Sequence, residues 1–331
     1  MKKRTDGRYQ YRITVNGKQK SFYGKTQKEA RDKADAYQNK RQGSNLFCDV
    51  ADEWYESHTN NVKYNTQSCY LAPYKDCKAY FEDMAVEDIK ASDVVDFLNK
   101  VKQKGYATHT IQLRQIALNL ILDYACQKDY VQVNVSRLVS APKSHTTQRQ
   151  ELTQEQIKKV LNSDFLLPKL ILYTGLRKAE ALALTTDDIT DDGYITVNKE
   201  VVYKSNTPVV VHTTKTQSGN RLVPISEELA QTLKTNPSGY IFSADGSKPF
   251  SRRNYNTYWN KFTDYLGTHV TAHQLRHSFS TQMFYAGVEV KTAAAIMGHS
   301  KVELMLNRYT HLRNKQLDEA KPKVTSMYND L

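Results

Sequence analysis

The first part of the chain alternates apolar and polar residues with a period of two. Four apolar residues from Tyr9 to Val15 alternate with polar ones, and Asn16-Gly17 follows directly. This alternation is typical of a β-strand, and Asn-Gly supplies the positive φ angles of a tight two-residue turn. The pattern therefore predicts a hairpin over residues 8–23.

Helical periodicity replaces this alternation after residue 25. Thr26 and Glu29 form a capping box, which predicts a helix reaching about Arg41. The polar stretch 42–45 indicates a linker. Residues 46–140 are expected to form a helical bundle, with helices over 47–58, 69–81, 91–104 and 111–128. The last of these carries an apolar stripe formed by Ile111, Ala117, Leu118, Ile121, Leu122 and Ala125.

The rest of the chain combines both periods. Residues 142–149 have no apolar period and indicate an exposed linker, and a capping box at Thr153 and Gln156 places the start of a new domain near residue 150. The predicted fold class is multidomain and mostly α with α+β parts, with domains over 1–42, 46–140 and 150–331. In the last domain we expect helices over 154–163, 166–174, 177–184 and from 226 to the end, strands over 194–203, 209–214 and 221–225, and a turn at 218–220.

The net positive charge of the chain favours a negatively charged binding partner. The 331 residues carry 47 Lys plus Arg against 35 Asp plus Glu, a formal net charge of +12. The excess is concentrated in residues 1–45, where thirteen basic and four acidic residues leave a net charge of +9. A basic module with interleaved aromatic residues is typical of nucleic-acid binding, and a solvated charged surface is the alternative. The candidate DNA-binding residues are Arg4, Arg8, Arg12, Lys18, Lys20 and Lys25, four of which (Arg8, Arg12, Lys18 and Lys20) are expected on the polar side of the hairpin.

Other classes of protein are disfavoured. No apolar run approaches the length needed to cross a bilayer, and Met1-Lys2-Lys3-Arg4 is followed by polar residues and tyrosines rather than by the apolar stretch of a signal peptide. The four cysteines are sparse and show no CxxC pairing, which is typical of a reducing compartment. These features predict a soluble cytoplasmic protein.

Short motifs in the last domain contain the candidate catalytic residues. Each has a structural alternative when taken alone: Arg177 lies three residues before Glu180 and can simply pair with it, and Tyr309 is one of 22 tyrosines. The full set is Arg177, Lys215, His273, Arg276, His299 and Tyr309, with Glu180 and His277 in supporting positions.

Together these residue types supply what cleavage of a DNA phosphodiester requires, namely a nucleophile, charge neutralisation and a general acid. Arg177 and Arg276 each offer a planar fork of donors to a phosphate, which lysine cannot copy. His273 and His299 add donors, and one of them can accept the phenol proton. A phenol with a pKa of about 10 is a poor nucleophile at neutral pH, so Tyr309 needs a base and nearby cations. A general acid for the leaving oxygen is expected in Lys215.

The motifs TGLRKAE, TTKT, HQLRH, MGHS and NRYTHL resemble those of the tyrosine recombinase (phage integrase) family over residues 150–315. The step from His299 to Tyr309 is ten residues, one longer than the commoner spacing. Residues 46–140 are similar to the family's helical, SAM-like core-binding domain. Residues 1–42 resemble the arm-type DNA-binding module of integrases from conjugative transposons and related mobile elements.

The resemblance implies a mixed α/β catalytic domain over 150–331 and a site-specific recombinase that integrates or excises a mobile element. It implies a 3′-phosphotyrosine intermediate, a free 5′-hydroxyl, and neither a metal, another cofactor nor ATP. The implied partners are double-stranded DNA with core-type and arm-type sites, three further copies of the chain in a homotetramer, an excisionase and host DNA-bending proteins. The implied location is the bacterial cytoplasm, on the nucleoid when DNA is bound.

Three other classes of protein share some of these features. His273 and His277 have the i,i+4 spacing of a zinc site, but Gln274 stands where a metalloprotease has glutamate. A DNA-binding protein that has lost its activity is disfavoured because every expected position is filled. A type IB topoisomerase shares the chemistry, but it does not need a separate basic module.

The tail 313–331 is either a segment that docks on a neighbouring subunit or a frayed terminus.

Overall fold

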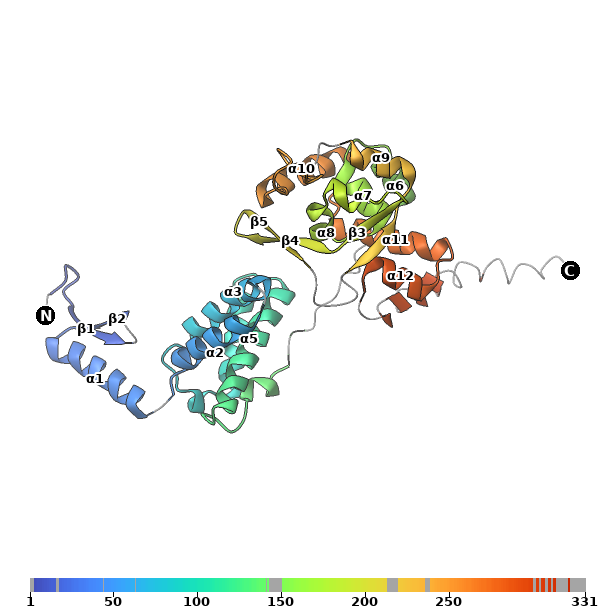
Figure 1. Ribbon diagram of the computed structural model, residues 1–331. Coiled ribbons are helices and arrows are strands. Elements are labelled where there is room, and N and C mark those ends of the chain that lie inside the picture. Colours follow the sequence, from blue (N-terminus) through green and yellow to red (C-terminus); the bar gives the residue numbers. More distant parts are fainter. Residues whose placement is uncertain are drawn as a thin grey trace. The chain divides into compact units, whose positions relative to one another are not determined.

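In the computed structural model, the chain forms two compact units, Met1–Thr146 and Thr147–Leu331 (Figure 1). Four predicted features lie wholly or mostly outside the described residues: the Asn16-Gly17 turn, the 142–149 linker, the 218–220 turn and the 313–331 tail. The structure describes residues 3–15, 18–43, 45–62, 64–140, 142, 151–212, 220–235, 239–299, 302, 303, 305, 306, 309, 310, 312, 313 and 321.

The predicted hairpin and helix are present at the start of the first unit. Strands β1 (Tyr9–Val15) and β2 (Lys18–Gly24) pair antiparallel, and helix α1 (Gln27–Gly43) packs on one face of them. Ala30 and Ala34 are fully buried under this contact, because only a small side chain lets the helix approach the strands so closely. The predicted 42–45 linker begins too early, since α1 includes Gly43, and the carbonyl of Asn45 accepts a hydrogen bond from Val86 N (2.8 Å).

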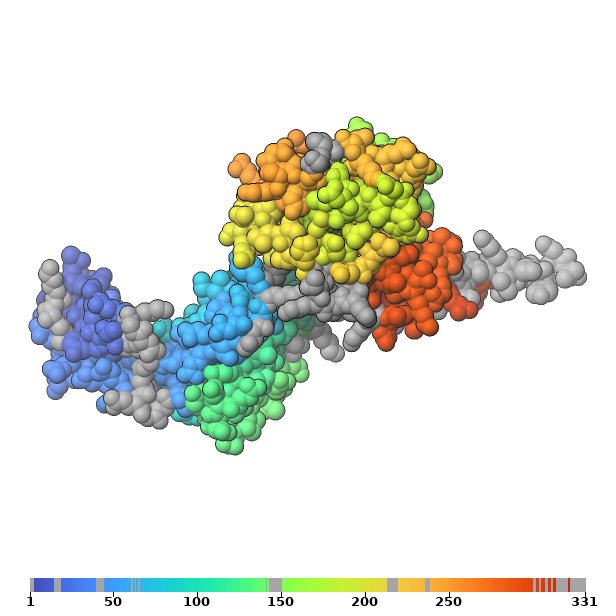
Figure 2. Space-filling model, viewed as in Figure 1, coloured from blue at the N-terminus to red at the C-terminus, as the bar shows by residue number. Residues whose placement is uncertain are grey.

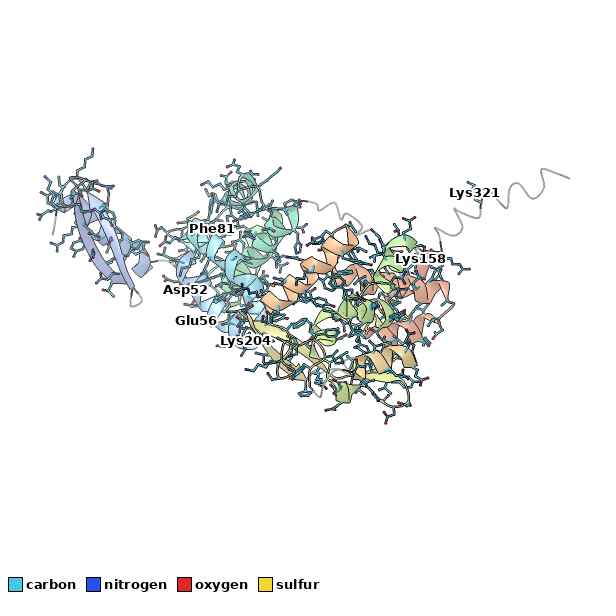
Figure 3. The ribbon with its side chains drawn as sticks, turned by 90° about the horizontal axis from the view of Figure 1, so that it is seen from above. Asp52, Glu56, Phe81, Lys158, Lys204 and Lys321 are labelled. Carbon is cyan, nitrogen blue, oxygen red and sulfur yellow. The ribbon has the colours of Figure 1, made fainter. Side chains whose placement is uncertain are left out.

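Four helices build the rest of the first unit, as the periodicity predicts. They are α2 (Phe47–Asn61), α3 (Tyr64–Phe81), α4 (Ala91–Gln103) and α5 (Thr108–Gln127). The α5 stripe from Ile111 to Ala125 is buried throughout, and it packs with Phe47, Phe97 and Phe81 (labelled in Figure 3) in one core. Helix α3 begins five residues before the predicted start at Cys69.

In the second unit, helices come first, short strands follow, and helices return (Figure 1). Helix α11 packs along α7, and α8 packs along β4. Lys204, at the tip of the β4–β5 hairpin, is exposed (Figure 3). The elements are α6 (Gln154–Leu161), α7 (Leu166–Thr174), α8 (Lys178–Ala183), β3 (Tyr194–Val197), β4 (Lys199–Lys204), β5 (Thr207–His212), β6 (Arg221–Pro224), α9 (Glu227–Lys234), α10 (Arg252–Leu266), α11 (Ala272–Tyr285) and α12 (Val290–Met297).

Two predictions for this unit are wrong. The single strand expected over 194–203 is broken at Asn198, because β3 pairs with β6 whereas β4 pairs with β5. The helical pattern expected from 226 onward is interrupted by irregular chain over 239–251. There Asp245 accepts hydrogen bonds from Ser247 N (3.0 Å), and Gly246 has a φ of +79°, so the local hydrogen bonds favour a turn over a helix.

The second unit has a large core and a small one. The large core joins α6–α8, the strands, α9 and α10 to the start of α11. The small one gathers Met283, Ala293, Ala294, Met297, Met305 and Tyr309, and Figure 2 shows its orange-red elements as a lobe of this unit. No helix in the described ranges combines the length and the apolar character that crossing a membrane requires.

Candidate active site

Arg276 lies in the second turn of α11, whose N-cap is Thr271. The hydroxyl of Thr271 accepts a hydrogen bond from Gln274 N (3.3 Å), and Gln274 Oε1 accepts one from Thr271 N (2.9 Å). The Arg276 side chain is buried, and it donates from Nη1 to the Gly175 carbonyl (2.6 Å) and from Nη2 to the Met297 carbonyl (2.5 Å). Burial, with a contribution from the charge of Arg177, lowers the pKa of Arg276 to about 9, so the side chain is still cationic at pH 7.

Glycines end the two helices whose last carbonyls accept hydrogen bonds from the arginines of this site, and these carbonyls are free to do so because the helices stop there. Gly175 ends α7 with a φ of +64°, and Gly298 ends α12 with a φ of +63°. A Cβ atom on Gly175 would lie 2.3 Å from Phe279 Cδ1, and one on Gly298 would lie 2.8 Å from Arg221 Nη1. Both positions therefore require glycine for conformation and for space.

Arg177 precedes α8 and faces the same two helix ends. Its backbone N–H donates to Glu180 Oε2 (2.8 Å), its Nη1 donates to Glu180 Oε1 (2.7 Å), and its Nη2 donates to the Gly298 carbonyl (2.8 Å). The pair with Glu180 that explains an ordinary surface arginine is thus present. The side chain is nevertheless 44% exposed, so part of its guanidinium remains open to a ligand.

Sequence reasoning missed Arg221, which it treated only as the first residue of a strand. Arg221 donates from Nη1 and Nη2 to Glu180 (3.1 and 2.8 Å) and from Nε to the Ile296 carbonyl (2.7 Å). Burial alone raises the pKa of Glu180, but the hydrogen bonds and charge of Arg221, together with those of Arg177, outweigh it and lower the pKa to about 2. Glu180 is 41 residues away in sequence, so no local spacing reveals this pair.

His299 follows Gly298 and lies beside the arginines. The ring is half-buried, and its Nδ1 is buried without a hydrogen-bond partner among the residues that the structure describes. Burial and the charges of Arg276, Arg177 and Arg221 lower the pKa of His299 to about 4. The ring is therefore neutral at pH 7, and a neutral imidazole carries one donor and one acceptor nitrogen.

This low pKa predicts a dependence of stability on pH. An unfolded histidine takes up its proton near pH 6.5, whereas folded His299 does so only near pH 4. The unfolded state therefore binds more protons between these values, and the contribution of His299 to stability is complete above pH 6.5 and falls as the pH drops toward 4. We expect histidine NMR titration to show one pKa near 4 that is missing in His299→Gln. We also expect the difference in free energy of unfolding between the wild type and this variant to shrink as the pH falls. Equal losses in both proteins would contradict the prediction.

His273 and His277 stand one turn apart on α11. Their Nε2 atoms are 2.7 Å apart, and their rings meet edge to face. His273 is exposed, while His277 is half-buried. Gln274, which stands where a metalloprotease has glutamate, is occupied with the Thr271 cap. The described residues contain no group of three or more side chains arranged to hold a metal ion.

Tyr309 belongs to the small core of the second unit. Its ring lies edge to face with Phe284, with 4.9 Å between ring centres, and the residue is 7% exposed. Met305 N and Leu306 N both donate to the Val302 carbonyl, so a helical turn precedes the tyrosine. Two of the predicted site residues, Lys215 and the side chain of Lys18, are outside the described residues.

The surface beside the arginines is hollowed into a cavity of about 530 Å³. Arg177, Lys178, His269, His273 and Arg276 contribute its basic lining, and the aromatic rings of α10 contribute apolar lining. A cavity with this lining is suited to an anion attached to an apolar or ring-shaped group. The structure thus brings four predicted residues to one place: Arg177, Arg276, His273 and His299.

Among the basic residues of the hairpin, Lys20 is on the face opposite to that predicted. It pairs with Ile13 in the β1–β2 register, and directly paired residues share a face. Its Nζ lies 3.1 Å from Glu82 Oε1, 2.7 Å from Asp83 Oδ1 and 4.2 Å from the centre of the Tyr37 ring. Lys20 is therefore occupied with protein groups.

The other basic side chains described in this module are open to solvent. Arg4 and Arg8 are exposed and pair with Asp6 at 3.5 and 2.9 Å, an arrangement that is weak at a surface and easily exchanged for another anion. Arg12 is exposed on the open face of the hairpin, and Lys25 is exposed just before α1. The open face is thus basic and accessible.

Comparison with known proteins identifies the family. Residues 147–316 match the family model described as "Phage integrase family", and residues 47–141 match "Phage integrase central domain". Because the first match covers more than half of the chain, the chain belongs to the phage integrase family, and it is therefore a tyrosine recombinase. This confirms the resemblance inferred from the motifs and the predicted fold class.

Individual relatives agree with this assignment. The chain is 27% identical to a "Tyrosine recombinase XerC-like" of Caldanaerobacter subterraneus subsp. tengcongensis, over 95% of each chain. It is 29% identical to the "Transposase from transposon Tn916" of Enterococcus faecalis, over 69% of this chain and 64% of that protein. Among solved structures, the Tn1549 transposon integrase in complex with a circular intermediate DNA has a TM-score of 0.66 at 22% identity, covering 83% of this chain and 100% of that one. A lambda integrase dimer bound to a COC' core site has a TM-score of 0.63 at 19% identity, covering 92% and 93%.

Proposed function

We propose that this protein is an integrase that cuts and rejoins double-stranded DNA at specific sites through a covalent 3′-phosphotyrosine, and so integrates or excises a mobile genetic element. The observation that carries the proposal is the cluster of Arg177, Arg276 and His299 around the carbonyls that end α7 and α12. Fixed donors aimed at one cavity suit a phosphate whose charge increases during the reaction.

The proposed reaction assigns one step to each group. The Tyr309 oxygen attacks the scissile phosphorus while the bond from phosphorus to the 5′ oxygen breaks. Arg177 and Arg276 neutralise the non-bridging oxygens, and neutral His299 or His273 accepts the phenol proton. Lys215 donates the proton that the 5′ oxygen needs to leave as a hydroxyl, a role taken from the family motif. Reversal of these steps on a new 5′-hydroxyl seals the DNA without ATP.

The proposed division of labour follows the three predicted domains. Residues 1–42 bind arm-type DNA, 46–140 bind the core site together with the catalytic domain, and 150–331 carry out the chemistry. Exchange between two duplexes requires four active sites, so the assembly on DNA is a homotetramer. One of the solved relatives is a "lambda integrase tetramer bound to a Holliday junction". The substrate places the protein in the bacterial cytoplasm, on the nucleoid.

A nicked suicide substrate tests the proposal. The duplex carries the junction sequence of the element, with a nick placed so that the fragment bearing the 5′-hydroxyl diffuses away after cleavage. We expect a protein–DNA adduct that survives SDS and forms in the presence of EDTA. Tight binding to the same DNA with no adduct would contradict the proposed activity, and an adduct that EDTA abolishes would contradict the metal-free mechanism.

Substitutions on the two faces of the hairpin are expected to affect the binding of arm-type DNA to different extents. Arg12→Gln removes an exposed cation from the open face, so affinity should fall and the slope of log K against log salt should drop by about 0.9, one phosphate contact. Lys20→Gln removes a cation that Glu82 and Asp83 already neutralise, so both quantities should stay close to wild type. Fluorescence anisotropy titrations at about 50 to 200 mM salt, a range over which the Debye length falls about twofold, measure both the affinity and the slope. Equal effects of the two substitutions would contradict the face assignment.

A further inference from the structure

Arg221 is placed to control the two helix ends that hold the catalytic arginines. It begins β6, and only 7% of its side chain is exposed. Its three nitrogen atoms all donate to protein groups, two to the Glu180 carboxylate and one to the Ile296 carbonyl. A side chain engaged in this way does not reach a phosphate itself, so any effect on the reaction passes through its partners.

The first partner, Glu180, connects Arg221 to Arg177. Each carboxylate oxygen is shared between them: Oε1 accepts from Arg177 Nη1 (2.7 Å) and Arg221 Nη1 (3.1 Å), and Oε2 accepts from Arg177 N and Arg221 Nη2 (both 2.8 Å). Arg221 therefore fixes the plane of the carboxylate, and the carboxylate fixes the Arg177 guanidinium. The side chain of Glu180 is 6% exposed, so water is not positioned to replace Arg221.

The second partner, the Ile296 carbonyl, connects Arg221 to the end of α12. The next two carbonyls, those of Met297 and Gly298, accept hydrogen bonds from Arg276 and Arg177. A Cβ atom on Gly298 would lie within 3.1 Å of three atoms of the Arg221 guanidinium, which shows how closely the guanidinium packs against this turn. His299 follows directly, so the turn also sets the place of that ring.

The charges of the cluster suit the transition state better than the ground state. Arg177, Arg221 and Arg276 with Glu180 give a net charge of +2. A phosphodiester carries one negative charge, and the five-coordinate phosphorus of the transition state carries two. Without Arg221 the net charge of the cluster falls to +1, and the preference for the transition state weakens.

We propose that Arg221 is a positioning residue of the recombinase, which holds Arg177 and the 296–299 turn in their reactive arrangement and supplies one of the two net charges. The proposal rests on the function proposed above. The alternative is that Arg221 forms a buried ion pair that serves folding alone. The two differ in how the effect of an Arg221 substitution depends on Arg177 and on the charge of the phosphate.

Two substitutions separate charge from geometry. Arg221→Lys keeps the charge but has a single nitrogen, which cannot hold both Glu180 oxygens and the Ile296 carbonyl. Arg221→Met removes the charge at similar length. We expect single-turnover cleavage of the suicide substrate by Arg221→Lys to fall about 10–100-fold, as for other groups that orient catalytic residues, and that by Arg221→Met to fall further. Lys199→Met is the matched control, since it removes a largely buried cation (15% of its side chain is exposed) that pairs with Asp188 (2.7 Å) in the same unit.

The decisive measurement is a double-mutant cycle with Arg177→Lys. Because Arg221 acts in part through Arg177, Arg221→Lys should lower the cleavage rate by a smaller factor in the Arg177→Lys background than in the wild type, and the cost that remains reports on the 296–299 turn. The cost should also shrink when a methylphosphonate, which lacks one charged oxygen, replaces the scissile phosphate. Thermal unfolding of every variant is measured alongside.

The outcomes decide between the proposals. The positioning role would be overturned if Arg221→Lys lowered the cleavage rate by the same factor in both backgrounds and on both substrates. It would also be overturned if Lys199→Met lowered the cleavage rate as much at an equal loss of thermal stability. Either result would leave the integrase assignment intact. No adduct from the wild type, despite DNA binding, would overturn both.

Discussion

Tyr309→Phe is expected to bind core-site DNA as the wild type does and to form no covalent adduct. The substitution removes one oxygen atom, and that atom is the proposed nucleophile. The phenylalanine ring keeps the edge-to-face contact with Phe284 and the surrounding methionines, so the small core should stay folded. SDS gels of the suicide substrate measure the adduct, and a mobility-shift titration measures binding.

Tyr285→Phe is the matched control for this experiment. Tyr285 packs near the same ring, with 5.5 Å between its centre and that of Phe284, and it is 51% exposed. Its adduct yield should equal that of the wild type. An adduct formed by Tyr309→Phe would assign the nucleophile to another residue, and loss of the adduct from Tyr285→Phe as well would point to damage to the lobe.

Arg276→Lys is expected to reduce the cleavage rate by about 10²–10³-fold, the usual cost of losing a fixed donor to a developing oxyanion. The guanidinium has five N–H donors, and two hold the Gly175 and Met297 carbonyls. A lysine ammonium at this position cannot bind both carbonyls and a phosphate in the same plane. The measurement is single-turnover cleavage at saturating protein, which separates the chemical step from binding.

Stability must be measured with the same variant, because a carbonyl left buried without a donor costs about 1–3 kcal/mol. The control is Arg253→Lys, which changes an exposed arginine of the same unit. We expect the loss of cleavage by Arg276→Lys to persist at temperatures well below its unfolding midpoint. Recovery of wild-type cleavage in that range would show that Arg276 serves folding alone.

Local signals in the sequence predicted much of the fold and part of the site. Thr26 and Thr153 cap helices where their spacing to Glu29 and Gln156 predicts, and the apolar stripe of α5 is buried as its period predicts. These features depend on residues within one or two turns of each other, so they are visible in a single sequence.

The features that were missed depend on contacts across long stretches of sequence. Arg221 acquires its role only because β6 and α12 meet beside α8. Lys20 faces Ile13 because of the hairpin register, which alternation alone did not assign correctly. The break at Asn198 follows from a change of pairing partner, since β3 and β4 join different strands.

The burial of Tyr309 has a consequence for cleavage at unintended sites in the host chromosome. A basic recombinase meets a vast excess of wrong sites, and it binds each of them briefly through their phosphates. The Tyr309 hydroxyl, proposed above as the nucleophile, is packed into an apolar lobe, so attack on a phosphate would require this lobe to rearrange first. Under the proposed mechanism, short encounters would then end before a strand is cut, and breakage would be confined to sites where the protein remains bound long enough.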